Sequence, residues 1–277
     1  MGQALVTGSA GFVGQHFVRY LHEDGWKVHA IDVKTGHDAL DFFANRYDPF
    51  SYDLVVHCAA NVGGRRVIEH TPFAQAHNLE LDVALFRWAR RTRPGRILYF
   101  SSSAAYPVSL QHASIRHSLE EKDIDLDGGP NFGKPDQLYG WSKLTGELLA
   151  AQARDDGLAV TVVRPFSGYG EDQEDCYPFP AFIDRALRRE DPFLIWGDGT
   201  QVRDFIHIDD IVGACMALYQ ADENGPVNLG YGQGHSMNEL ALRICATAGY
   251  EPQFEHSSLD PVGMQYRVSK ADRKSVV

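Results

Sequence analysis

The chain has 277 residues, 44% of them hydrophobic, and a formal net charge of −11, so it can bury one large core or a core with a smaller lobe. The negative charge argues against a nucleic-acid surface, which needs clustered cations, and no apolar run reaches the length of a membrane span. Because the four cysteines form no paired motif and a strand begins within the first residues, the sequence predicts no metal site, no signal peptide and a cytoplasmic location.

A glycine-rich turn follows the first predicted strand, residues 3–7, and a helix is predicted from residue 12. Glycine allows positive φ and lets a ligand approach the backbone, and the N-terminus of a helix attracts phosphate. The spacing of the glycines therefore predicts a dinucleotide-binding turn. The expected cofactor contacts in this turn are Gly8, Gly11, Phe12, Val13 and Gly14.

The second predicted strand, residues 28–31, ends in Asp32. An acidic residue at this position can accept hydrogen bonds from the adenosine ribose of a dinucleotide. Its charge would also repel the 2′-phosphate of NADP, so NAD is the favoured cofactor and NADP the less favoured one. Lys34, two residues later, would weaken that preference.

Further strands and helices alternate as far as residue 165. Strands are predicted at residues 52–60, 96–100 and 158–165, and helices at residues 72–91 and 138–154. Residues 108–137 are polar and predict a loop. This alternation predicts an α/β fold with a doubly wound parallel sheet of the Rossmann type. Residues 1–165 are expected to form the NAD-binding domain, which also receives about residues 205–230.

The pattern loosens after residue 165. Residues 166–170 and 171–175 are expected to be loops, residues 227–229 a short strand, and residues 181–188, 209–219 and 237–248 helices. These segments predict a smaller, discontinuous substrate-binding lobe over residues 166–277, interleaved with the sheet.

Tyr139 and Lys143 are four residues apart at the start of a predicted helix, so both side chains project from one face. A phenol with a pKa near ~10 is too weakly acidic to act as a base at neutral pH. A nearby ammonium lowers that pKa and makes Tyr139 a candidate acid and base. Ser102 or Ser103, at the end of a neighbouring strand, can donate a hydrogen bond to the same substrate oxygen.

Together these motifs resemble the extended short-chain dehydrogenase/reductases, also called the NAD-dependent epimerase/dehydratase family, which act on nucleotide sugars. The resemblance rests on residues 7–14, Asp32, residues 58–60 (CAA), 101–103 (SSS), 139–143 (YGWSK), 164–166 (RPF) and 197–210 (GDGTQVRDFIHIDD). It implies catalysis by Ser102, Tyr139 and Lys143. It implies further cofactor contacts at Asp38, Ala39, Ala59, Ala60, Asn78, Lys143 and Phe166. It implies substrate contacts at Ser103, Ser167, Arg203 and Arg267, with the two arginines on the diphosphate.

The branch that the chain resembles most is that of GDP-fucose synthase and GDP-mannose 3,5-epimerase. Those enzymes have a cysteine where this chain has Ala104, and a second acid near residues 176–179, where this chain has no histidine or lysine. Dehydratases and decarboxylases have acidic residues after the serine, and Ser103 and Ala104 supply none. The resemblance therefore implies redox chemistry at C4 of the sugar rather than proton exchange at C3 or C5.

Three functions follow as hypotheses. The first is a nucleotide-sugar epimerase that uses bound NAD to oxidise and re-reduce C4. The second is a 4-keto nucleotide-sugar reductase that consumes NAD(P)H, and the third is a non-catalytic dinucleotide-binding sensor. The family also implies a homodimer formed through two helices, with apolar contacts from Phe86, Trp88, Leu148 and Leu149, although these residues can also pack on the sheet.

Overall fold

The computed structural model describes residues 2–45, 51–126 and 133–270. Its centre is a six-stranded sheet in the order β10-β6-β4-β3-β1-β2. The strands are β1 (Gln3–Thr7), β2 (Lys27–Ile31), β3 (Leu54–His57), β4 (Arg96–Phe100), β6 (Val160–Pro165) and β10 (Gly225–Leu229). All neighbours in this sheet are parallel, so the predicted α/β fold with a parallel sheet is confirmed.

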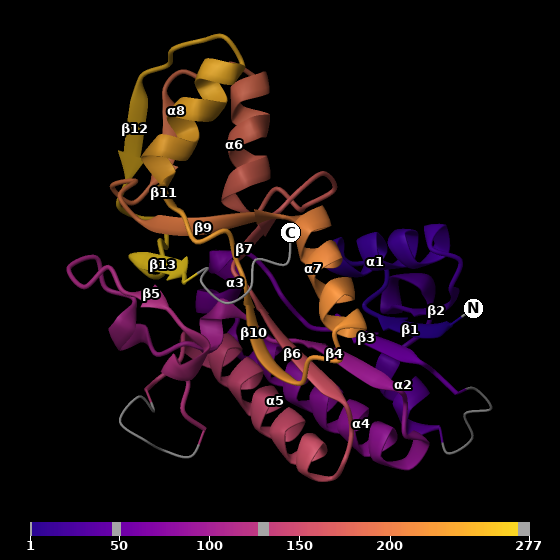
Figure 1. The fold of residues 1–277 in the computed structure, drawn as a ribbon. Helices are drawn as coiled ribbons and strands as arrows, with labels where there is room; N and C mark the ends of the chain where they lie inside the picture. Colours follow the sequence, from indigo (N-terminus) through magenta and orange to yellow (C-terminus); the bar gives the residue numbers. More distant parts are fainter. Residues whose placement is uncertain (1, 46–50, 127–132, 271–277) are drawn as a thin grey trace.

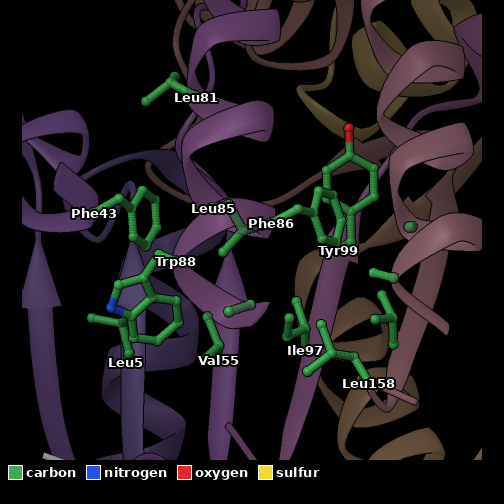
Figure 2. Packing of buried hydrophobic residues seen from close by; sticks show 14 of the residues in the cluster. Leu5, Phe43, Val55, Leu81, Leu85, Phe86, Trp88, Ile97, Tyr99 and Leu158 are labelled. Atoms are coloured by element: carbon green, nitrogen blue, oxygen red, sulfur yellow. The ribbon is translucent and has the colours of Figure 1, made fainter. Parts of the chain in front are cut away.

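Helices cover both faces of the sheet (Figure 1). One face carries α1 (Phe12–Glu23) and α7 (Ile208–Gln220), and the other carries α2 (Ala39–Ala44), α4 (His77–Thr92) and α5 (Gln137–Asp155). Because both faces are covered, every residue of β3 and of β4 is buried, as is typical of parallel sheets. Figure 2 shows the core on the α4 and α5 side, where Phe43, Trp88 and Tyr99 pack over the strands.

The chain order creates a switch point at β1, because β2 pairs on one side of β1 and β3 on the other. In such sheets a ligand binds outside the carboxyl ends of the strands, where the order reverses. The glycine-rich turn after β1 and the segment after β3 both lie at this edge.

A second group of elements, here called the smaller lobe, lies beyond the carboxyl end of β6 (Figure 1). It contains α6 (Pro178–Leu187) and α8 (Met237–Thr247), which share a separate apolar core with β8 (Phe193–Trp196) and β12 (Phe254–Ser257). Its main sheet has the order β11-β9-β13-β5, with β7 paired to β9. These strands are β5 (Ser118–Leu119), β7 (Ser167–Tyr169), β9 (Val202–His207), β11 (Gly234–Ser236) and β13 (Tyr266–Ser269).

Several predictions for the segments of the smaller lobe are wrong. Residues 166–170 were expected to be a loop but contain β7, and the expected loop at 108–137 contains β5, while residues 127–132 of that loop lie outside the described ranges. Most strands of the lobe were not predicted. They are only two to six residues long and pair with distant segments, so they leave little periodic signal in the sequence.

The segment after β3 also differs from prediction. A short helix, α3 (Arg65–His70), precedes the expected helix at 72–91, whose first five residues form a 3₁₀ turn before α4 begins at His77. Phe73, within this 3₁₀ turn, is 87% exposed. Phe86 and Trp88 are buried in the core on the sheet, so they are not available as dimer contacts. Among the described helices, none is both long and apolar enough to cross a bilayer.

Candidate active site

The glycine-rich turn packs closely against neighbouring backbone at the start of α1. Gly8 has φ of +69°, and a Cβ there would lie 2.6 Å from the backbone nitrogen of Ala59. A Cβ at Gly14 would overlap the carbonyl oxygen of Gly8. The N-cap of α1, Gly11, supplies no side-chain hydrogen bond, so the first N–H groups of the helix, at Phe12 and Val13, are available to an anion.

Asp32 is 8% exposed and lies beside this turn. Its Oδ2 accepts a hydrogen bond from the backbone N–H of Ala10 at 3.0 Å, and its Oδ1 accepts one from the N–H of Lys34 at 2.8 Å. These two bonds fix the carboxylate at the end of β2. The Lys34 ammonium extends toward Glu174, 4.0 Å away.

The other predicted cofactor residues are distributed around the same edge. Asp38 caps α2 by accepting from the N–H of Leu40 at 2.8 Å, and Ala39 is buried in the core. Asn78 is buried and uses both ends of its amide on the backbone of Asn61, at 2.6 and 3.1 Å. It therefore holds the segment after β3 in place.

The remaining predicted cofactor residues are two alanines and a phenylalanine. Ala59 and Ala60 follow β3 and are partly buried. Phe166 is buried against Tyr106.

Lys143 is a buried cation at the carboxyl end of β4. Its Nζ donates a hydrogen bond to the carbonyl oxygen of Phe100 at 2.9 Å, and the side chain lies over the ring of Tyr99. In the described ranges no carboxylate pairs with it within 4.0 Å. A buried ammonium without an anion is costly, so a negatively charged partner would stabilise it.

Tyr139 lies on the first turn of α5 and is partly buried. A Cβ on the next residue, Gly140, would overlap the carbonyl oxygen of Ala104, so this glycine lets the helix start pack tightly on the turn after β4. Asp136, the N-cap residue of the same helix, accepts a hydrogen bond from Arg267 on β13 at 2.9 Å. The phenol-bearing residue thus lies between the large sheet and the smaller lobe.

The serines after β4 differ in their surroundings. Ser101 is buried and donates to Glu147, and Ser103 is also buried. Ser102 is partly exposed, and its Oγ accepts from the N–H of Ala104 at 3.1 Å. Its O–H therefore remains available to a ligand, which favours Ser102 over Ser103 as the donor.

Arg203 and Arg267 are paired in register on the adjacent parallel strands β9 and β13. Arg267 donates to Gln111 Oε1 at 2.5 Å and to Asp136 Oδ2 at 2.9 Å. Among the described residues, Arg203 donates only to backbone carbonyl oxygens, those of Val202 and Val262, at 2.8 and 3.0 Å. Burial, followed by repulsion from Arg267 and Arg65, lowers the pKa of Arg203 to about 9.

Ser167, the other predicted substrate contact, lies on β7, next to β9, and is partly buried.

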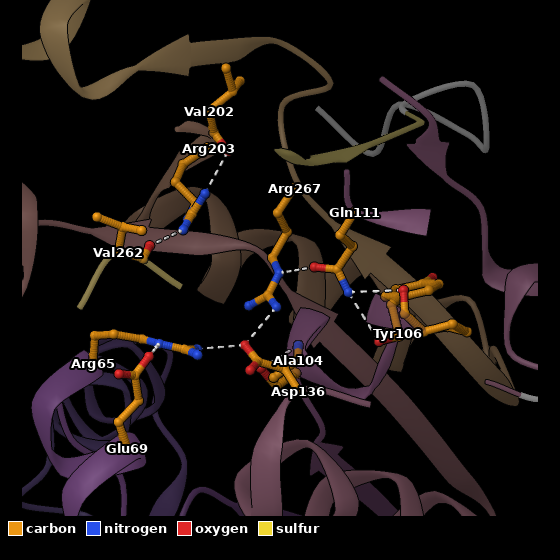
Figure 3. Close-up of polar contacts among 12 residues, drawn as sticks. Arg65, Glu69, Ala104, Tyr106, Gln111, Asp136, Val202, Arg203, Val262 and Arg267 are labelled. Atoms are coloured by element: carbon orange, nitrogen blue, oxygen red, sulfur yellow. Dashed lines mark hydrogen bonds and ion pairs between the residues drawn. The ribbon is translucent and has the colours of Figure 1, made fainter. Parts of the chain in front are cut away.

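Sequence reasoning missed Arg65 and Asp136. Arg65 Nη1 lies 2.7 Å from Asp136 Oδ2, the oxygen that also accepts from Arg267 (Figure 3). Arg65 also donates through Nε to Glu69 at 2.6 Å. The available signal was the Arg65–Arg66 pair, which directly follows Gly63 and Gly64 near the carboxyl end of β3.

The arrangement combines a glycine-rich turn at a helix start, a buried ammonium one helical turn from a phenol, a hydroxyl after β4, and a pair of guanidinium groups. The described residues contain no group of three histidine, cysteine or acidic side chains suited to a metal ion. The chemistry that this donor set supports is proton transfer at a substrate oxygen next to a dinucleotide, with an anionic substrate group held by the arginines.

Comparison with known proteins supports the same class. A family model described as the NAD dependent epimerase/dehydratase family matches residues 4–230. The chain is 30% identical over 300 residues to dTDP-4-dehydro-6-deoxy-D-allose reductase from Streptomyces sp, covering 99% of this chain and 89% of that protein. It is 30% identical over 273 residues to GDP-mannose 3,5-epimerase 1 from Oryza sativa subsp. indica, covering 91% and 70%.

A solved structure of MoeE5 in complex with UDP-glucose and NAD is similar along almost the whole chain. The TM-score is 0.77 at 28% sequence identity, and the match covers 99% of this chain and 91% of that one. The predicted resemblance and the predicted NAD cofactor are thereby confirmed at the level of the family. The chain belongs to the NAD-dependent epimerase/dehydratase family of nucleotide-sugar enzymes.

Proposed function

We propose that this protein is a nucleotide-sugar epimerase that acts through oxidation and re-reduction at C4 of the sugar. The observation that carries the proposal is the placement of Lys143 and Tyr139 on one helix, with the Lys143 ammonium buried at the carboxyl end of β4. The arginines of β9 and β13 lie on the side of the smaller lobe. This arrangement supports a sugar held between the dinucleotide and the lobe.

The residues around the first turn fit NAD. The N–H groups that follow Gly8 and Gly11 would hold the pyrophosphate, and Asp32 would accept from the adenosine ribose. Lys143 would hold the nicotinamide ribose. When bound, NAD supplies a reversible hydride acceptor at its nicotinamide ring.

The protein's own side chains transfer the proton of the O4 hydroxyl and hold the substrate. As a phenolate, Tyr139 takes the proton of the O4 hydroxyl when C4 is oxidised; as a phenol it returns that proton when C4 is reduced, so the phenolate is regenerated in each cycle. Lys143 stabilises the phenolate form, because a nearby positive charge favours the ionised phenol. Ser102 donates a hydrogen bond to the same oxygen. Arg203 and Arg267 hold the diphosphate, which leaves the sugar free to turn over between the two steps.

The surrounding residues favour C4 chemistry alone. Ser103 and Ala104 are buried and carry no acid, and the segment near Cys176 and Tyr177 contains no histidine or lysine. This environment offers no acid and base pair for proton exchange at a neighbouring carbon.

The proposal is tested with purified protein, bound NAD and a set of UDP, GDP, dTDP and CDP sugars. We expect one pair of C4-epimeric sugars to interconvert with no net formation of NADH. Replacing Tyr139 by Phe should lower kcat by roughly 10²-fold or more, as loss of an acid–base group does. The exposed Tyr20→Phe variant is the matched control and should keep full activity. If no pair interconverts, the epimerase proposal is wrong.

A 4-keto nucleotide-sugar reductase is the second candidate. It is favoured by the 30% identity, over 99% of this chain, to a dTDP-4-dehydro-6-deoxy-D-allose reductase. Stoichiometric oxidation of NADH or NADPH by a 4-keto-6-deoxy nucleotide sugar would decide for it. A sensor without catalysis, the third hypothesis, would retain its ligand response in the Tyr139→Phe variant and show no turnover in the wild type.

We also propose a homodimer that forms through α5. In place of Phe86 and Trp88, the apolar residues available on this helix are Trp141, 37% exposed, and Leu148, 44% exposed. They are seven residues apart and therefore lie on one face. Sedimentation at micromolar concentration tests this, and a monomeric mass would contradict it. The cytoplasmic location and the division at residue 165 stay predictions.

A further inference from the structure

Three arginines converge where the large sheet meets the smaller lobe. Arg65 from α3, Arg203 from β9 and Arg267 from β13, here called the arginine cluster, turn their guanidinium groups toward one another (Figure 3). Asp136 and Glu69 are the carboxylates paired with them in the described ranges. Three positive charges against two negative charges leave the cluster with a net positive charge.

The cluster is electrostatically unfavourable as it stands. The side chain of Asp136 is 3% exposed, those of Arg65 and Arg267 are 17% and 13% exposed, and Arg203 has no carboxylate partner in the described ranges. Repulsion between partly buried like charges costs free energy unless an anion joins them. The fold therefore prepares this position for a negative ligand.

The hydrogen bonds leave a donor free on two of the guanidinium groups. Arg65 uses Nε and Nη1, and Arg267 uses Nε and Nη2. Within the part of the chain that the structure describes, Arg65 Nη2 and Arg267 Nη1 have no hydrogen-bond partner. A planar guanidinium with a free edge is suited to phosphate oxygens.

The same short loop brings Arg65 next to Arg203. The carbonyl oxygen of Val262 accepts from Arg203 Nη2 at 3.0 Å. A Cβ on the following residue, Gly263, would lie 3.0 Å from Arg65 Nε, and Gly263 has φ of +68°. A side chain at residue 263 would press on the Arg65 guanidinium, so the glycine lets Arg65 lie flat against the loop that also holds Arg203.

Asp136 connects this cluster to the catalytic helix. It is the N-cap residue of α5, three residues before Tyr139. Its backbone N–H donates to the carbonyl oxygen of Ala104 at 3.0 Å, and its Oδ2 accepts from both Arg65 and Arg267. One carboxylate oxygen thus sets the orientation of two guanidinium groups relative to the first turn of α5.

We propose that Arg65 is a third cationic contact for the diphosphate of the nucleotide sugar, beside Arg203 and Arg267, and that Asp136 is the positioning residue that aims Arg65 and Arg267 at it. This inference rests on the proposed function, because it takes the ligand to be a nucleoside diphosphate sugar.

The adjacent residue provides a matched control. Arg66 lies over the ring of Trp196, with its guanidinium carbon 4.6 Å from the ring centroid, and pairs with Asp260 at 2.5 Å. It carries the same charge on the same helix but is engaged with the outer part of the smaller lobe. Arg66 is therefore not expected to contact the diphosphate.

The test is calorimetric titration of the NAD-loaded protein with UDP, GDP, dTDP and CDP and with the corresponding nucleosides. For the diphosphate that binds, Arg65→Gln should weaken affinity by roughly tenfold or more, the effect of losing one charged hydrogen bond. Arg65→Lys should recover part of that loss, and Arg66→Gln should bind like the wild type. The affinity for the nucleoside should not change in any variant.

The Asp136→Asn variant tests whether Asp136 positions the two arginines or competes with the phosphate for them. If Asp136 positions the two arginines, this variant binds the diphosphate more weakly although the site has become more positive, and KM rises more than kcat falls. If Asp136 merely competes with the phosphate for the arginines, the variant binds more tightly, and the positioning role is wrong. Should Asp136→Asn fail to fold, Glu69→Gln, which releases only Arg65 Nε, serves instead and should show a smaller loss.

The outcomes distinguish this inference from the proposed function. Unchanged diphosphate affinity in Arg65→Gln overturns the role of Arg65 and leaves the epimerase proposal standing. A wild-type protein that binds NAD but none of the four nucleoside diphosphates overturns the proposed function itself.

Discussion

Asp32 illustrates how one buried side chain combines a structural and a selective role. It accepts from two backbone N–H groups, of Ala10 and Lys34, so its carboxylate keeps one orientation beside the glycine-rich turn. Such a fixed negative charge attracts ribose hydroxyls and repels a 2′-phosphate. We therefore propose that Asp32 sets the preference of the protein for NAD over NADP.

We predict that Asp32→Ser reduces the preference for NAD over NADP. The serine retains a short acceptor but loses the charge, so affinity for NAD should fall by about tenfold, as expected for loss of a charged hydrogen bond, while affinity for NADP should rise. Fluorescence titration of both cofactors measures the ratio. The exposed Asp41→Ser variant on α2 is the control, and an unchanged ratio in Asp32→Ser would contradict the assignment.

At the same scale, local sequence patterns predict some of the candidate site residues and miss others. Gly8, Asp32 and the pair of Tyr139 and Lys143 were predicted because each signal lies within one turn or one helix. The pairing of Arg65 with Asp136 spans 71 residues, and no spacing rule connects them. Asp136 in addition precedes a helix, where an acidic residue normally indicates only a cap.

At the scale of elements, α5 organises the site because it packs closely on the sheet. Gly140 permits contact with the turn after β4, and Gly146 faces Tyr99 and Asp82. The next residue, Glu147, is buried, accepts from Ser101 and pairs with Arg164 on β6 at 2.6 Å. These contacts fix the rotation of the helix and hence the direction of Tyr139 and Lys143.

Two glycine substitutions test this packing. A Cβ at Gly146 would overlap Tyr99 Oη and lie 2.6 Å from Asp82 Oδ2, so Gly146→Ala should lower the free energy of unfolding by about 1–3 kcal/mol. Gly213 on α7 is exposed and has open space around it, so Gly213→Ala should raise that free energy by roughly 0.5–1 kcal/mol. Urea denaturation measures both. Equal effects of the two variants would show that the close packing of α5 is unimportant.

The success of prediction also differed between elements. The buried strands β3, β4 and β6 have long apolar runs and were placed from the sequence. The strands of the smaller lobe are short and depend on partners far along the chain, such as β13 on β5 and β9. Their pairing is decided by tertiary contacts, which a local pattern does not contain.

At the scale of the whole molecule, ion pairs join the large sheet to the smaller lobe. Asp136 accepts from Arg267 on β13, and Arg66 on α3 pairs with Asp260 after β12. Both pairs cross from the first half of the chain to its last part. Each pair contributes to stability only while its carboxylate is ionised, and the pair at Asp136 is the more buried of the two.

The pH dependence of stability follows from these carboxylates. Burial disfavours the ionised form of Asp136, but Arg267 and Arg65 outweigh burial and lower its pKa. Hydrogen bonds from Arg66 and Ser257 lower the pKa of Asp260. A carboxyl group whose pKa is lower in the folded state stabilises the fold fully above its unfolded pKa of about 4, and this contribution is lost as the pH falls below that value.

We therefore predict that the wild type loses stability steeply below about pH 4 and that Asp136→Asn has a shallower acid dependence. The amide cannot be protonated in this range, so the variant is less stable than the wild type at neutral pH and the two converge as the pH falls through the folded pKa of Asp136. Urea denaturation between neutral and acidic pH gives the free energies of unfolding. Arg66→Gln releases Asp260 at the other contact. This variant should change the acid dependence of the free energy of unfolding less than Asp136→Asn does, because that ion pair is more exposed. A constant difference between wild type and Asp136→Asn at every pH would mean that the charge of Asp136 does not hold the lobe on the sheet.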